Sequence, residues 1–156
     1  MRRALVPVVV FALALPAWAA AAQLDNDGTL SVKDGRGTFI INARGGIIGS
    51  FAKGRVVITD PIDADGTGPI VSGDDWHRDR GDATDVYGGT KVRFRLIGGT
   101  FKVKVVGTGV NLSVVGRGNV TLNGAGTDDD GTYAVNGADV APVPDILQFA
   151  LSATSP

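Results

Sequence analysis

Glycine interrupts this chain so regularly that it leaves room only for short extended segments. From Gly28 onward, the stretches between glycines are rich in Val, Ile, Thr and Phe, and most alternate apolar with polar residues. Such alternation is typical of half-buried β-strands. All 16 acidic residues are Asp, which favours turns over helix interiors. We therefore expect an all-β protein with strands at Leu30–Lys33, Thr38–Asn42, Ile47–Ala52, Arg55–Asp60, Lys91–Ile97, Phe101–Val106, Val110–Val115 and Asn119–Asn123.

The turns in the second half predict a register. Gly98-Gly99 resembles a two-residue hairpin loop, which would place Leu96 opposite Phe101 and Phe94 opposite Val103. With further turns at Gly107-Thr108 and 116–118, the chain is expected to form a four-strand antiparallel meander from Lys91 to Asn123. One apolar face would then hold Phe94, Leu96, Phe101, Val103, Leu112, Val114, Val120 and Leu122.

The segment Leu30 to Asp60 reads as a second meander, in which Lys53-Gly54 would pair Phe51 with Val56. Short strands near Thr132–Val135 and Ile146–Leu151 are expected at its edges. Two meanders with one apolar face each predict antiparallel meanders forming a two-sheet sandwich or closed barrel. A short Gly-punctuated β-solenoid is the second choice, because some turns recur at even intervals.

The first 22 residues predict export. Met1-Arg2-Arg3 precedes an apolar run and a string of small residues ending at Ala22, which is the pattern of a cleaved signal peptide. Residues 23–156 would then be a single all-β domain outside the cytoplasm, with no membrane span after cleavage. The 15 basic and 16 acidic side chains nearly balance, which argues against a general nucleic-acid partner.

A predicted basic patch follows from the Gly98-Gly99 register. Arg95 would lie opposite Lys102 and Arg93 opposite Lys104, with Lys91 beside them. Like charges that face each other across strands are unfavourable, so something should compensate them. An anionic envelope polymer or protein is one candidate partner. The alternatives are that Asp residues of the connection 61–89 fold over the patch, or that the patch is simply solvated.

The connection 61–89 is an Asp/Gly-rich insertion, and long connections in small domains are often functional. It carries the chain's single histidine, His77, with Ser72, Asp75 and Trp76 nearby. A small extracellular hydrolase with its site here is therefore the alternative function. We expect no catalytic residue, however, because no nucleophile motif accompanies the histidine.

Three Asp-Gly clusters raise the question of calcium: 25–28, 63–66 and 128–131. None continues into an EF-hand loop, which ends in Glu, and Asp before Gly is ordinary turn chemistry. We expect no metal site and no cofactor. The expected function is a secreted, non-enzymatic β-domain with a binding or structural role at the bacterial envelope or outside the cell.

Overall fold

The computed structural model describes residues 26–62 and 68–155, all of which lie in strands, turns or loops. The signal peptide predicted for residues 1–22 falls outside these residues. The eight strands are β1 (Gly28–Ile62), β2 (Ile70–Ser72), β3 (Trp76–Asp79), β4 (Thr84–Leu96), β5 (Thr100–Gly124), β6 (Thr132–Val135), β7 (Ala141–Pro142) and β8 (Leu147–Leu151). The predicted all-β class is confirmed, and every strand pairing is antiparallel. No helix in the described ranges has the length and hydropathy needed to cross a membrane.

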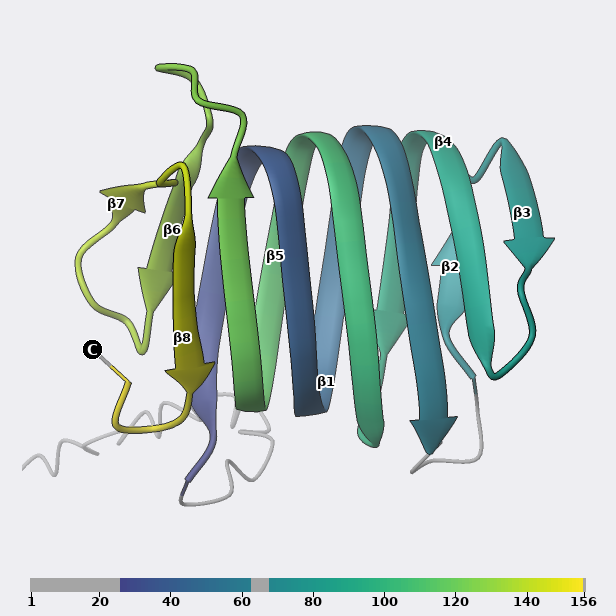
Figure 1. Cartoon of the computed structure of the whole chain (residues 1–156), viewed down its shortest axis with the longest axis horizontal. Helices are drawn as coiled ribbons and strands as arrows, with labels where there is room; N and C mark the ends of the chain where they lie inside the picture. Colours follow the sequence, from purple (N-terminus) through teal and green to yellow (C-terminus); the bar gives the residue numbers. More distant parts are fainter. Residues whose placement is uncertain (1–25, 63–67, 156) are drawn as a thin grey trace, which may run out of the picture.

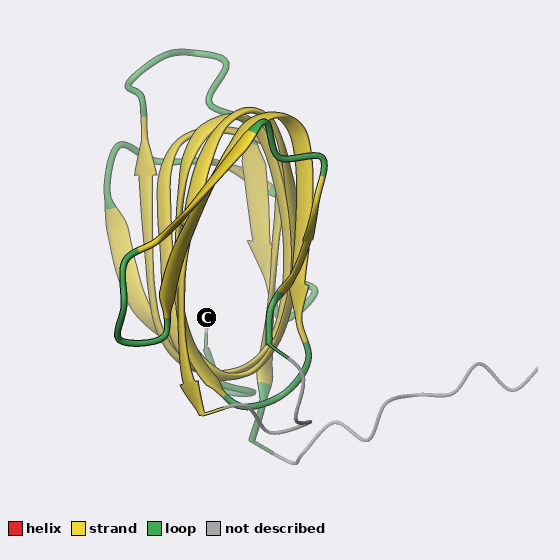
Figure 2. Ribbon diagram, turned by 90° about the vertical axis from the view of Figure 1, so that its right-hand side faces the viewer, coloured by secondary structure: helices red, strands yellow, loops and turns green. Residues whose placement is uncertain are grey.

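The three long strands wind into a flattened coil (Figure 1). β1 crosses from one side of the coil to the other at Gly37, Gly45 and Gly54, and β4 and β5 wind beside it. Seen end-on, the strands outline a narrow oval with two broad sides (Figure 2). The result is a sheet folded into two facing layers, which agrees with the predicted two-sheet sandwich.

We call the two broad sides layer A and layer B. Layer A runs, strand by strand, through β2, 92–96, 47–51, 110–116, 28–33, β6 and β7. Layer B runs through β3, 84–89, 54–59, 102–107, 37–44, 117–124 and β8. The hydrogen-bonded ladder thus extends along the coil, with β2 and β3 at one end and β6, β7 and β8 at the other (Figure 1).

Glycines form the corners because no side chain fits there. Gly54 has a φ of 156°, and a Cβ added to it would lie 2.2 Å from the carbonyl oxygen of Val106 on the next winding. Gly116, at the opposite narrow edge, also has a φ of 156°, and its Cβ would lie 2.3 Å from the Arg44 carbonyl oxygen. Both the backbone conformation and the close approach of the neighbouring winding therefore select glycine.

The predicted hairpin registers are wrong. Leu96 pairs with Ile47 and not with Phe101, which lies on layer B opposite Ala43. Likewise Phe51 pairs with Val92, while Val56 pairs with Tyr87 and Val105. The glycine pairs are corners that carry the chain to the other layer, so consecutive segments face each other across the core.

The predicted burial of the core residues is nevertheless confirmed, although they belong to two facing layers and not to one face of a meander. All eight residues expected on the apolar face are buried, from Val103 and Leu122 at 0% exposure to Leu112 at 4%. They join Phe39, Phe51 and other apolar side chains in one continuous cluster between the layers. The predicted strands at Thr132–Val135 and near Ile146–Leu151 are observed as β6 and β8.

Candidate functional site

The structure divides the five predicted patch residues between opposite surfaces. Arg93 and Arg95 lie on layer A, where they pair with Ser50 and Ile48. Lys102 and Lys104 lie on layer B, opposite Thr59 and Val57, and Lys91 has a positive φ beside the Gly89 corner. All five are exposed, as predicted, but the shared patch is wrong because β4 and the first part of β5 are not neighbours.

A cationic groove of about 440 Å³ lies instead on the outer surface of layer B, and we call it the Trp76 groove. Its lining residues are Arg55, Val57, Trp76, Arg78, Arg80, Val86 and Lys104. They come from β1, from the β3 segment and its turn, and from β4 and β5. Four of the seven are cations and none is acidic, so a single groove concentrates positive charge.

Trp76 stands at one side of this groove and is 46% exposed. Its indole lies directly over Gly88, since a Cβ on Gly88 would be 2.2 Å from Cζ2 of the ring. Gly88 also pairs with Arg55, which places the aromatic side chain close to a cation of the same groove. Glycine at position 88 therefore positions the only large aromatic surface that the groove offers.

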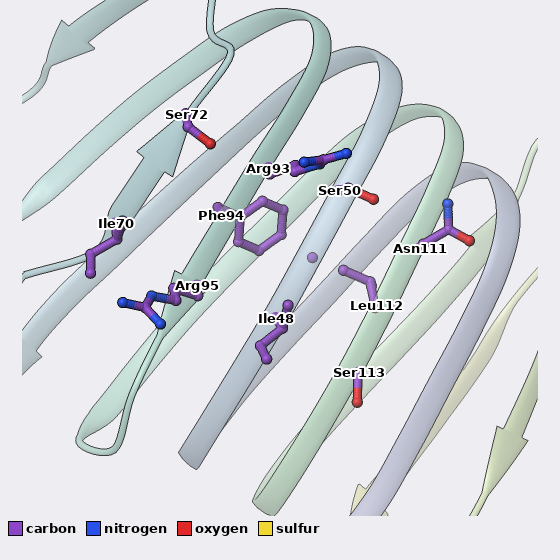
Figure 3. A pocket seen from close by; sticks show the side chains of 11 residues that line it. Ile48, Ser50, Ile70, Ser72, Arg93, Phe94, Arg95, Asn111, Leu112 and Ser113 are labelled. Carbon is purple, nitrogen blue, oxygen red and sulfur yellow. The ribbon is translucent and has the colours of Figure 1, made fainter.

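A second groove, of about 550 Å³, lies on the outer surface of layer A, and we call it the Ile48 groove (Figure 3). Ile48, Ile70, Arg93 and Arg95 project around it, together with small polar side chains. The full lining is Ile48, Gly49, Ser50, Ile70, Ser72, Arg93, Phe94, Arg95, Asn111, Leu112 and Ser113. This groove is more apolar than the Trp76 groove, and it too has no acidic lining residue.

The insertion 61–89 does not fold over a basic surface in its described part. Its strands β2 and β3 pair with β4 and extend the two layers at one end of the coil. Asp75 accepts hydrogen bonds from the backbone and hydroxyl of Thr90, at 3.0 and 3.4 Å. Within residues 26–62 and 68–155, no ion pair joins a cation of either groove to a carboxylate.

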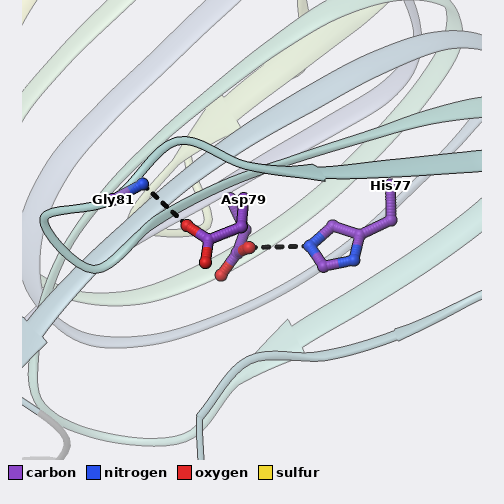
Figure 4. Close-up of polar contacts among 4 residues, drawn as sticks. His77, Asp79 and Gly81 are labelled. Carbon is purple, nitrogen blue, oxygen red and sulfur yellow. Dashed lines mark hydrogen bonds and ion pairs between the residues drawn. The ribbon is translucent and has the colours of Figure 1, made fainter.

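His77 meets a carboxylate, but not the one expected. Its Nε2 lies 2.7 Å from Oδ1 of Asp85 (Figure 4). Its ring stacks on Tyr87 at a centroid distance of 4.4 Å. Ser72, the hydroxyl considered for a hydrolase, lines the Ile48 groove on the other layer. The arrangement thus joins His77 to Asp85 without a Ser72 nucleophile.

Three carboxylates lie near Tyr87 at this end of the coil. Burial raises the pKa of Tyr87, and the nearby carboxylates of Asp85, Asp74 and Asp79 raise that pKa further, because they disfavour a phenolate. Asp79 itself accepts a 2.7 Å hydrogen bond from the backbone of Gly81, in the turn after β3 (Figure 4). The carboxylates of Asp74, Asp79 and Asp85 therefore gather near Tyr87, and none of them lines the Trp76 groove.

The Asp-Gly cluster at 128–131 serves as a turn. Asp130 is buried and accepts hydrogen bonds from the backbones of Gly126 and Thr127, at 2.7 and 3.1 Å, and from the Thr127 hydroxyl. The hydroxyl bond above all holds the pKa of the Asp130 carboxyl below its ordinary value. Among the described residues, no group of three His or Asp side chains is arranged to hold a metal ion.

Sequence reasoning missed Arg55, Arg78 and Arg80 as parts of a site. The signal was present in the alternation Trp76-His77-Arg78-Asp79-Arg80, because every second residue of a strand points to the same side. That spacing places Trp76, Arg78 and Arg80 together on the outer side of layer B.

The comparisons with known proteins found no relative of this chain. No protein-family model, no curated protein and no solved structure matches this chain.

Proposed function

We propose that this protein is an exported, non-enzymatic binding domain whose Trp76 groove takes the anionic groups of a polymer at the bacterial envelope or outside the cell. The observation that carries the proposal is the groove's lining, in which four cations converge without a carboxylate. Like charges gathered on neighbouring strands repel one another, and this cost is relieved when an anion binds between them. Arginines also bind carboxylate or phosphate groups through two parallel hydrogen bonds.

The groove suits one or two units of a chain that continues beyond it. Its volume of about 440 Å³ lies within the range of small-ligand sites, about 300–1,000 Å³, and it opens on a broad face. Trp76 adds an apolar surface next to the cations, which favours a unit with both a flat apolar side and a charged group. Acidic sugars have both properties, so an acidic polysaccharide is the polymer class that we propose.

Export is part of the proposal and rests on the N-terminal pattern. Residues 1–22 carry the charged start, apolar run and small-residue end of a signal peptide. The exported protein should have lost 19 to 22 residues when its intact mass is measured. Recovery of the full-length chain in the membrane would contradict this part of the proposal.

Binding to polygalacturonate, with neutral dextran as the reference, tests the groove. Replacing Arg55 and Arg78 by Gln should weaken binding by at least about tenfold, because each charge-assisted hydrogen bond contributes roughly 1.5–3 kcal/mol. Arg93→Gln with Arg95→Gln is the matched control, since it removes the same charge from the other layer. Binding should also weaken as salt rises.

Three results would count against the proposal. If both double variants weaken binding equally, net charge and not the groove is responsible. If the protein binds neither polygalacturonate nor dextran, the proposed polymer class is wrong. If new reducing ends appear in the bound polymer, the protein is a hydrolase and the non-enzymatic part fails.

A further inference from the structure

The outer surface of layer A gathers exposed aliphatic side chains. Ile48, Ile70, Ile97 and Val115 are exposed to between 42% and 64%. Ile70 and Ile48 lie on either side of Arg95 in register, and Ile97 and Val115 share a smaller hollow with Ile48. Large apolar side chains that are clustered, and not scattered singly, indicate a binding surface.

Small residues turn this surface into two hollows. Along the central segment of β1, the outward positions are Gly46, Ile48 and Ser50, so one large side chain stands between two small ones. The hollow on the Ser50 side is the Ile48 groove, and the hollow on the Gly46 side has a volume of about 220 Å³. Because Ile48 borders both, a flexible apolar chain can follow them as one trough.

Two arginines of β4 line one side of the trough. Arg93 and Arg95 both line the larger hollow, the Arg93 side chain extending toward Ser50 and the Arg95 side chain extending away from it, on the side of Ile70 (Figure 3). Neither takes part in an ion pair recorded for the described residues, and no acidic residue lines either hollow. The smaller hollow is lined only by apolar residues and Ser113. Arg95 therefore lies between the aliphatic side chains of Ile48 and Ile70, and Arg93 lies between the small polar side chains of Ser50 and Ser72.

We propose that layer A binds an anionic amphiphile, a molecule with a single alkyl chain and a terminal phosphate or carboxylate. The chain lies in the hollows on both sides of Ile48, and the anionic group is held by Arg93 and Arg95. This complementarity of shape and charge favours an amphiphile over a wholly polar anion, which would leave the aliphatic side chains in water. The site is on the opposite layer from the Trp76 groove, so this proposal can be tested independently of the proposed function.

Dodecyl phosphate and laurate, below the concentrations at which they form micelles, are suitable probes. Arg93→Gln with Arg95→Gln should weaken binding of both by at least about tenfold, while binding of uncharged dodecanol stays the same. Arg55→Gln with Arg78→Gln, on layer B, is the matched control and should leave binding of both probes unchanged.

A second pair of variants tests the place of the alkyl chain. Gly46→Leu should fill the smaller hollow, since the nearest atom to its Cβ is the Leu96 carbonyl oxygen at an ordinary 3.5 Å. This variant and Ile48→Ser should weaken binding of dodecyl phosphate and dodecanol alike. Thermal unfolding by circular dichroism verifies that each variant is folded.

Binding that none of these variants changes would overturn the proposal, and so would the absence of binding to both anionic probes. Binding to anionic lipid vesicles without binding to the monomeric probes would also overturn it, in favour of a membrane surface as the occupant.

Discussion

The two outer faces of the coil are built from the same three strands but present different surfaces. Layer B gathers four cations around Trp76, whereas layer A gathers aliphatic side chains beside Arg93 and Arg95. The difference arises because β1, β4 and β5 each pass from one layer to the other at a corner. Residues that are close in sequence, such as Arg95 and Lys104, therefore reach opposite surfaces, and one short stretch of chain contributes to both grooves.

The faces nevertheless share one property. Outward positions of β1, β4 and β5 carry cations, whereas acidic residues lie at corners and near the ends of the coil, as at Asp74 and Asp79. A nearly neutral chain can in this way present two cationic faces. Net charge alone hides such separation, because it averages over faces and ends.

The largest expected effect concerns the core that both faces share. Phe101 is 1% exposed and packs between the layers, so Phe101→Ala should lower the free energy of unfolding by about 3–5 kcal/mol. Denaturant unfolding measures this change. Since both grooves stand on the same core, the variant should weaken both kinds of binding as the protein unfolds. If the variant is fully folded and loses binding at only one groove, the result would contradict a shared core.

Sequence predicted this core because a hairpin and a corner place the same residues inward. Phe51 and Val56 point inward whether Lys53-Gly54 makes a hairpin, with the two side by side, or a corner, with the two on opposite layers. Alternation therefore fixed which side chains are buried but not which strands pair. The predicted patch failed for this reason, since it depended on the pairing.

The sites were harder to predict than the core. Exposure of Arg93, Arg95, Lys102 and Lys104 followed from alternation, but their neighbours come from β1 and from the insertion, far away in sequence. The hollows of layer A depend on which small residues lie beside which large ones across strands. Such neighbours are set by register, and register was the part that local turn patterns left open.

The second prediction concerns the corners that separate the faces. Gly54→Ala should destabilise the protein by about 1–3 kcal/mol, because its φ of 156° and the nearby Val106 carbonyl leave no place for a Cβ. Gly46→Ala is the matched control, since a Cβ there makes only an ordinary contact. Equal melting temperatures for the two variants would show that the Gly54 corner is not constrained.

The smallest effect is expected at the end of the coil, away from both grooves. Hydrogen bonds, first of all from the Thr127 hydroxyl, hold the pKa of Asp130 below its ordinary value of about 3.9. This carboxylate therefore stabilises the fold above that pH, and the contribution is lost as the pH falls through its folded pKa.

Thr127→Val tests this effect. The variant should be less stable than the unmodified protein near neutral pH. This difference in stability should shrink below about pH 4, as the Asp130 carboxyl of the folded protein becomes protonated. Binding at the two grooves should be unchanged. A stability difference that is constant from pH 7 to pH 2 would show that the ionised carboxylate is not responsible.

Cysteine cross-linking tests the separation of the two faces most directly, because the chain has no cysteine of its own. Ile48 and Arg95 are cross-strand partners on layer A, whereas Arg95 and Lys102 would be partners only in a Gly98-Gly99 hairpin. Oxidation should therefore join the pair Ile48→Cys and Arg95→Cys into a disulfide within one chain, and it should leave Arg95→Cys and Lys102→Cys reduced. Rapid cross-linking of the second pair and not the first would place all five cations on one face and contradict the two-layer coil.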